Sequence, residues 1–135
     1  LRARAALDRA GVSIRHLHLH TIKPFDAKQF LDHAGSVRHG VITLENHVTE
    51  GGIGSLVAET MADAGLGRRL IRLGLRDTYA HGGSRPYLMR CYGLDALALV
   101  RGIERLMGQA FGIDESHLDA ARIEDVHSLV KAEAL

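Results

Sequence analysis

Segments with strand-like spacing of apolar residues alternate along this chain with segments of helical spacing. Alternating or β-branched apolar runs predict three strands, at 12–19, 39–44 and 69–75. Apolar residues at helical spacing predict helices at 1–10, at 27–34, after the glycines at 51–54 as far as 65, at 84–91, at 94–107 and at 114–131. Strands that alternate with helices form parallel βαβ units. The pattern therefore predicts an α/β fold with an open, mostly parallel sheet and helices on both faces.

Helix starts are marked by capping residues. Asp26 is predicted to cap the helix at 27–34 with Gln29 as its partner, while Phe25 and Phe30 stand at hydrophobic-staple positions. Asp114 is the predicted N-cap of the last helix.

The opening helix has no strand before it to form the first crossover. We therefore expect the first strand of the sheet to precede Leu1, and the chain to be a piece of something longer. The 135 residues suit one domain, which we place at 1–109, with 110–135 as a helical extension of the same domain.

Composition narrows the class of protein. Apolar residues make up 46% and charged residues 24%, which excludes a disordered tail or a coiled coil. Seventeen Lys and Arg against sixteen Asp and Glu leave a net charge of +1, so we expect neither a nucleic acid nor a membrane as partner. The single cysteine, Cys91, cannot form an internal disulfide, and we expect a packed thiol in a reducing, cytoplasmic setting.

Three histidines alternate along the first predicted strand. An extended backbone points His16, His18 and His20 to one face, where imidazoles could bind zinc. Same-face neighbours lie about 7 Å apart on a strand. No cysteine or carboxylate nearby completes a tetrahedral set, so we favour polar edge or interface histidines that respond to pH and predict no metal site.

The segment 45–54 follows the second predicted strand and leads into a helix. Ligands of open α/β sheets bind at this position, and a helix start offers free N–H groups to an anion. Glu45, His47, Gly51, Gly52 and Gly54 are therefore candidates for an anion or interface site. The spacing is neither a dinucleotide nor a nucleoside triphosphate motif, and the carboxylates would repel an anion. A tight turn with Glu45 and His47 hydrogen-bonded near an interface is the favoured interpretation.

A second loop with the same setting follows the third predicted strand. Ser84 and Arg85 could add a hydroxyl, a guanidinium and free amides to the same crevice. The simpler interpretation is that Ser84 caps the next helix, in whose first turn Pro86 is tolerated. No nucleophile, base and orienting residue is visible in the sequence, so we predict no catalytic residue.

Three segments in order, Thr21–Asp26, Val41–His47 and Gly51–Glu59, resemble the C-terminal domain of transketolase-type thiamine diphosphate enzymes. The resemblance spans about 11–107. Three relatives compete: transketolase, above all the split kind with a separate C-terminal polypeptide; 1-deoxyxylulose-5-phosphate synthase; and the β subunit of 2-oxo acid dehydrogenases. The synthase typically has a histidine where this chain has Gly82, with His81 one place early. Split transketolase therefore comes first and the synthase second.

The resemblance implies a mostly parallel five-stranded sheet and a role in dimerisation and architecture. The intact enzyme would use thiamine diphosphate and magnesium to transfer two-carbon ketol units between sugar phosphates. The family's cofactor lies between other domains, so this chain alone is expected to bind neither group and to catalyse nothing. Its partners would be the remaining domains or subunit, in a homodimer. An isolated interaction or regulatory module with the same fold is the alternative.

Overall fold

The computed structural model describes residues 1–121. In chain order its elements are α1 (Arg2–Arg9), α2 (Ala27–Gly35), β1 (Val41–Val48), α3 (Ile53–Asp63), β2 (Leu70–Leu75), α4 (Arg85–Cys91), α5 (Ala96–Met107) and α6 (Glu115–Ala120). Among these residues, no helix is long and apolar enough to cross a membrane.

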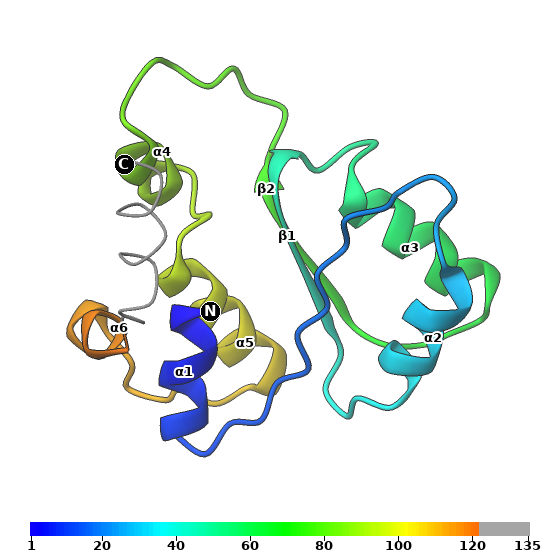
Figure 1. Ribbon diagram of the computed structural model, residues 1–135, viewed down its shortest axis with the longest axis horizontal. Coiled ribbons are helices and arrows are strands. Elements are labelled where there is room, and N and C mark those ends of the chain that lie inside the picture. The colour runs from blue at the N-terminus through cyan, green and yellow to red at the C-terminus, as the bar shows by residue number, and fades with distance from the viewer. Residues whose placement is uncertain (122–135) are drawn as a thin grey trace, which may run out of the picture.

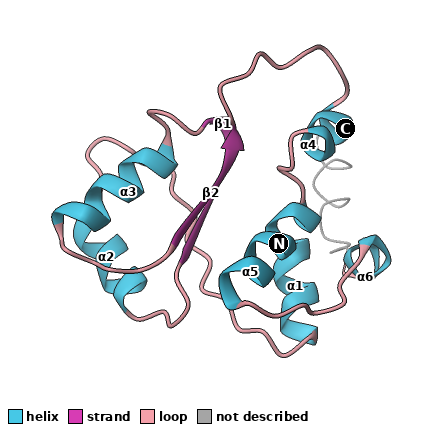
Figure 2. Ribbon diagram, turned by 180° about the vertical axis from the view of Figure 1, so that it is seen from behind, coloured by secondary structure: helices cyan, strands magenta, loops and turns pink. Residues whose placement is uncertain are grey.

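The centre of the fold is a parallel pair of strands, β1 and β2. They pair from Val41 with Leu70 to Leu44 with Leu73, and an irregularity in β1 precedes the pairing of Val48 with Leu75. Helices α1 and α5 lie on one side of the sheet, and α2 and α3 on the other (Figure 1, and from behind Figure 2). The predicted α/β fold with helices on both faces is confirmed.

Two hydrophobic clusters hold the helices to the sheet. One joins α1, α5 and α6 and contains Ala3, Ala6, Leu7, Val12, Val100, Ile103, Ile113, Leu118 and Ala121. The other joins α2 and α3 and contains Phe30, Ala34, Val57 and Met61. Fully burying a Val, Leu or Phe side chain stabilises a fold by about 1.5–3 kcal/mol, so these clusters are the main source of stability on either side.

The predicted strand at 12–19 is wrong. These residues are extended but have no ladder partner within residues 1–121, and the segment crosses in front of the two strands in Figure 1. Their side chains nevertheless divide as those of a strand do, because Ile14 packs on the cluster at α1 and α5 whereas Leu17 packs on the cluster at α2 and α3. The apolar alternation predicted extension correctly, but a strand also needs a neighbour for its backbone groups.

The second predicted strand is longer than its apolar run. We predicted that it ends at the polar cluster 45–47, yet β1 continues to Val48. The reason is that Glu45 is buried in the fold, 7% exposed, with partners from α3.

Most predicted helix starts are confirmed. The Asp26 side chain accepts a hydrogen bond from the Gln29 amide at 2.9 Å, and the rings of Phe25 and Phe30 are 5.9 Å apart. The Asp114 side chain caps α6, whose described part is Glu115–Ala120; the rest of the predicted helix to 131 lies outside the described residues.

Cys91 corrects another expectation, because it is exposed and not packed. It ends α4, a helix with no buried residue, so the side chain has no core to enter.

Candidate functional site

Glu45 reaches from β1 to the first turn of α3. Its Oε2 accepts a hydrogen bond from the Ile53 amide at 2.7 Å, and its Oε1 accepts one from the Gly54 amide at 2.9 Å. The first amides of a helix have no partner within the helix and carry partial positive charge. A carboxylate from the chain itself therefore occupies the place where a helix start would bind an anion.

Two glycines make room for this carboxylate. A Cβ on Gly52 would collide with the Glu45 carboxylate and lie 2.9 Å from the Val48 carbonyl oxygen. A Cβ on Gly54 would lie 2.9 Å from Oε1 of Glu45 and 3.0 Å from Oγ1 of Thr43. Gly51 differs, because its Cβ would meet nothing, but its φ of +73° lies in the left-handed region. The turn needs Gly51 for its backbone and the other two for space.

Ser55 and Arg72 fasten the loop from two more directions. The Ser55 hydroxyl accepts from the Gly51 amide at 3.0 Å and donates to the Thr49 carbonyl at 2.9 Å. Nη1 of Arg72, on β2, donates to the same carbonyl at 3.2 Å and to the Ser55 hydroxyl at 3.3 Å. Neither residue was predicted from the sequence. In the sequence near the loop, only the position of Ser55, four residues after Gly51, hints at such a contact. Arg72 gives no hint, because it lies on the neighbouring strand.

The other polar side chains of this segment have separate surroundings. His47 is exposed, and its Nδ1 lies 2.9 Å from the Val48 carbonyl oxygen. Thr43 is buried, and its hydroxyl has no hydrogen-bond partner in the structure. Hydrogen bonds from the Thr49 hydroxyl and from its own amide lower the pKa of Glu50, with smaller contributions from Arg72 and Arg76. Glu45 and His47 lie two residues apart, but hydrogen bonds tie them to different groups.

The second candidate loop lies elsewhere. Ser84 precedes α4 but its side chain makes no capping bond, and Arg85 is exposed in the first turn. Figure 1 shows α4 on the opposite side of the sheet from α3. The structure therefore does not bring Ser84 and Arg85 to the glycine loop.

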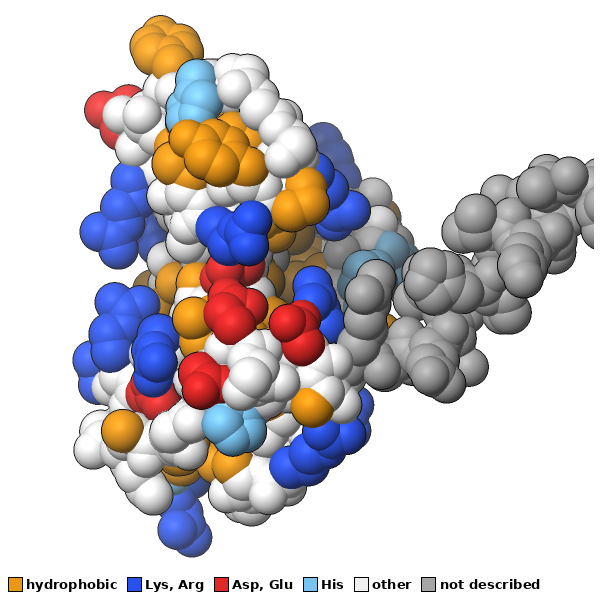
Figure 3. All heavy atoms as spheres, turned by 90° about the vertical axis from the view of Figure 1, so that its left-hand side faces the viewer, with side chains coloured by type: hydrophobic (Ala, Val, Ile, Leu, Met, Phe, Trp, Pro, Cys, Tyr) orange, Lys and Arg blue, Asp and Glu red, His pale blue; other side chains and the backbone are white. Residues whose placement is uncertain are grey.

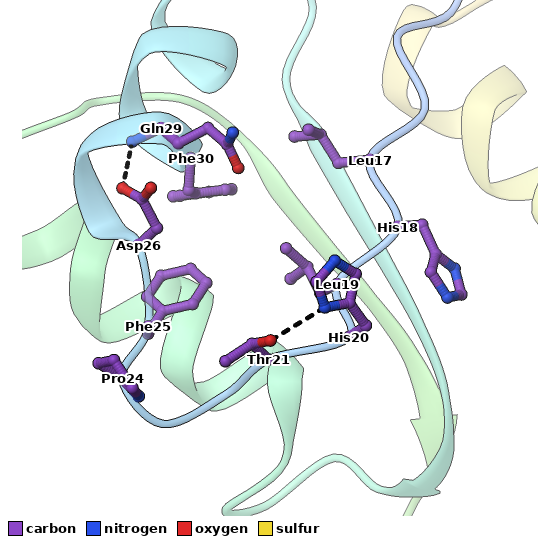
Figure 4. A pocket seen from close by; sticks show the side chains of 10 residues that line it. All are labelled: Leu17, His18, Leu19, His20, Thr21, Pro24, Phe25, Asp26, Gln29 and Phe30. Atoms are coloured by element: carbon purple, nitrogen blue, oxygen red, sulfur yellow. Dashed lines mark hydrogen bonds between the residues drawn. The ribbon is translucent and has the colours of Figure 1, made fainter.

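The histidine segment lines a shallow hollow of about 310 Å³ with the start of α2 (Figure 4). His16, His18 and His20 are all exposed. The rings of His18 and His20 are 6.5 Å apart, and Nδ1 of His20 lies 2.9 Å from the Thr21 hydroxyl. Within residues 1–121, no group of three or more His, Cys, Asp or Glu is placed to hold a metal ion.

The glycine loop does not fit a diphosphate. The amides of Ile53 and Gly54 already bind a carboxylate, and the space above Gly52 is filled by it. A bound anion would have to displace Glu45 or approach its negative charge in a partly buried setting, which is unfavourable. The arrangement instead holds the end of β1 and the start of α3 in a fixed geometry.

A parallel sheet between helical layers, with a glycine-rich turn that a strand carboxylate closes, defines the chain as an α/β domain. Residues 1–99 match the family model described as the transketolase C-terminal domain, and the chain belongs to this family.

The chain is similar to parts of two kinds of enzyme, transketolase and 1-deoxy-D-xylulose-5-phosphate synthase. A protein described as a transketolase C-terminal section, from Methanocaldococcus jannaschii, is 34% identical over 103 residues, which are 76% of this chain and 31% of that protein. The 1-deoxy-D-xylulose-5-phosphate synthase of Parabacteroides distasonis is 36% identical over 94 residues, 70% of this chain and 15% of the enzyme. The synthase of an Acidovorax species is 37% identical over 108 residues, 80% of this chain and 16% of the enzyme. The chain thus spans less than a third of each of these relatives.

Proposed function

We propose that this chain is the C-terminal, non-catalytic domain of a transketolase-type enzyme that transfers two-carbon ketol units between sugar phosphates. Its contribution is to dimerisation and to the architecture of the enzyme. The observation that carries this proposal is Glu45, because its carboxylate closes the family's glycine loop from within. A site filled by the protein itself supports a structural role better than a substrate-binding one.

The intact enzyme would be a cytoplasmic homodimer that uses thiamine diphosphate and magnesium, as its family implies. Those groups would be held by other domains, because the amides of Ile53 and Gly54 at the helix start already bind the Glu45 carboxylate. In such an assembly, Glu45, Gly51, Gly52 and Gly54 shape the loop, and the exposed His47 is available for contact with a neighbouring domain or subunit.

We further propose that another strand, upstream of α1 in the intact protein, lies between the segment 12–19 and β1. The support is the segment itself, which is extended, sends Ile14 and Leu17 to opposite helical layers and has no strand beside it within residues 1–121. A strand inserted there would give both neighbours a ladder and enlarge the sheet.

The second candidate is the C-terminal domain of 1-deoxyxylulose-5-phosphate synthase, which the synthases among the relatives favour. The loop before α4 carries His81 and Gly82, with the histidine one place earlier than in the synthase pattern. A 2-oxo acid dehydrogenase β subunit or an isolated interaction module remains a weaker candidate, since neither gains support from the relatives named above.

Two measurements on the intact protein test the proposal. First, parallel assays of ketol transfer between sugar phosphates and of 1-deoxyxylulose-5-phosphate formation should show the first reaction. Second, His47→Ala should weaken dimerisation in sedimentation experiments while turnover per assembled active site stays unchanged. Asn46→Ala is the matched control, because Asn46 is also exposed and is the neighbour of His47 on the same strand. A large loss of turnover in His47→Ala with assembly intact would show that the loop belongs to the active site.

A further inference from the structure

Strand β2 has one free edge in the described part of the chain. Its only strand partner there is β1. The Val41 amide of β1 and the Thr49 amide just after β1 donate to the carbonyls of Arg69 and Leu75 at 2.8 and 2.9 Å. Backbone groups along a strand alternate in direction. The amides and carbonyls of Leu70, Arg72 and Gly74 therefore point away from β1, toward the free edge.

A groove of about 470 Å³ runs along this edge, and more of its lining residues are basic than acidic. Its charged lining residues are Arg69, Arg72, Arg76 and Arg105, against Glu50 and Asp77. None of the four arginines forms a salt bridge with a carboxylate of residues 1–121. On the face shown in Figure 3, by contrast, basic and acidic side chains lie beside one another.

The arginines flank the edge from both faces of the sheet. Arg69 donates to the Arg105 carbonyl near the end of α5 at 3.0 Å, whereas Arg72 contacts the loop that begins α3. Helices α5 and α3 cover opposite faces (Figure 2). Arg69 and Arg76 are seven positions apart, which is about 23 Å along an extended chain. The positive groups thus form a line along the edge and not a single cluster.

We propose that the free edge of β2 binds an extended, acidic polypeptide segment as an additional strand. The segment's backbone would pair with the free groups of Leu70, Arg72 and Gly74. Because side chains alternate between faces along a strand, neighbouring acidic residues would reach Arg69 and Arg105 on one face and Arg72 and Arg76 on the other.

The geometry favours a polypeptide over other anions. A single phosphate would contact only one end of so long a line of arginines. A single-stranded nucleic acid normally needs aromatic side chains on which its bases stack, and no residue that lines the groove is aromatic. Arginines on a bare edge also discourage pairing between copies of a protein. A purely protective role predicts no affinity for an acidic peptide, so one binding experiment distinguishes peptide recognition from protection of the edge.

The test uses the intact protein and a fluorescent eight-residue peptide of alternating Glu-Glu and Val-Thr pairs, followed by anisotropy at low and physiological salt. Arg76→Gln combined with Arg105→Gln should weaken binding about tenfold or more, since neither side chain hydrogen-bonds within the described structure. Arg90→Gln, an exposed arginine on α4, is the control and should leave binding unchanged. Amide exchange at Leu70, Arg72 and Gly74 should slow when the peptide binds.

Three further outcomes would overturn the proposal. The same peptide with N-methyl groups on alternate amides should bind much more weakly, and equal binding would mean that only charge is recognised. Preferential binding of an oligothymidylate of matched length would identify a nucleic-acid surface. No binding to the intact protein, together with aggregation of the arginine double variant, would show that the arginines only protect the edge.

Discussion

The two loops that follow the strands make an instructive pair. Each connects the end of a strand to a helix and contains glycines before the helix start. After β1, the loop is fixed by the Glu45 carboxylate, the Ser55 hydroxyl and the Arg72 guanidinium. After β2, residues 76–84 are exposed, and His81 contacts the rings of Tyr87 and Tyr92 and hydrogen-bonds the Tyr92 hydroxyl.

The two loops differ in the hydrogen-bond partner of the helix start that follows, and not in the capping residue within the turn. Ser84 is a favoured capping residue, yet it makes no capping bond, whereas Gly52, which has no side chain, precedes a helix start that is hydrogen-bonded. The partner of α3 comes from eight positions earlier in the chain, on the neighbouring strand. A helix start is thus closed by whatever group the fold places opposite to it, and a good local cap is neither required nor sufficient.

The variant with the largest expected effect on the difference between the two loops is Glu45→Ala. Removing the carboxylate leaves the Ile53 and Gly54 amides without partners in a partly buried place. An unsatisfied buried group costs about 1–3 kcal/mol, so we expect a loss of about 3–4 kcal/mol in the free energy of unfolding. Urea denaturation measures it.

Glu45→Gln supplies the graded comparison, because it keeps one acceptor oxygen and should cost about half as much. Arg85→Ala at the start of α4 should change stability little, since that side chain is exposed. Similar losses for Glu45→Ala and Arg85→Ala would remove the distinction between the loops.

The second test separates the two kinds of glycine. In Gly52→Ala the new methyl group meets the Glu45 carboxylate and the Val48 carbonyl, and we expect a cost of about 2–3 kcal/mol. In Gly51→Ala the methyl group has open space but the left-handed φ is strained, at a cost of about 1 kcal/mol. Thermal denaturation of both variants gives the order, and a larger loss for Gly51→Ala would show that space is not the constraint.

The third test concerns pH. The pKa of Glu50 is lowered mainly by the Thr49 hydroxyl. The ionised form is therefore stabilised in the folded state, and this stabilisation is complete above the ordinary value of 4.5 and is lost as the pH falls through the lower folded value. Thr49→Val, which keeps the shape, should raise the pKa toward 4.5. NMR titration of the Glu50 carboxyl carbon reads it directly, and an unchanged midpoint would exclude the hydroxyl as the cause.

The smallest expected effect is that of Tyr92→Phe in the second loop. The Tyr92 hydroxyl lies 3.0 Å from Nδ1 of His81, in an exposed setting, so its loss should cost less than about 1 kcal/mol. Amide exchange should become faster in 78–83 and stay unchanged in 49–54. Faster exchange in both loops would mean that they are coupled.

The sequence was sufficient where structure depends on local chemistry. The spacing of Val100 and Ile103 predicted α5, and the cap at Asp26 with its pair of phenylalanines was read from neighbouring positions. The resemblance of the ordered motifs predicted the family that the comparisons show.

It was insufficient where a residue depends on a distant partner. The apolar alternation at 12–19 predicted extension, but it could not say whether a neighbouring strand is in reach. Polar residues at 45–47 suggested the end of a strand, because the amides that satisfy Glu45 belong to another element. The contact of Arg72 with the glycine loop depends on the pairing of β1 with β2, so it could not be predicted from the sequence either. Whether Glu45, His47, Ser84 and Arg85 contact another subunit stays a prediction.

The carboxylate of Glu45 also bears on whether this part of the fold depends on anything outside it. A helix start that binds an anion from outside keeps unpaired N–H groups until that anion arrives. Here the strand brings the negative charge itself, and the Ile53 and Gly54 amides at the start of α3 are satisfied by a residue of the same chain. At this point of the fold, the connection between β1 and α3 is therefore self-sufficient and needs no bound ion to complete it.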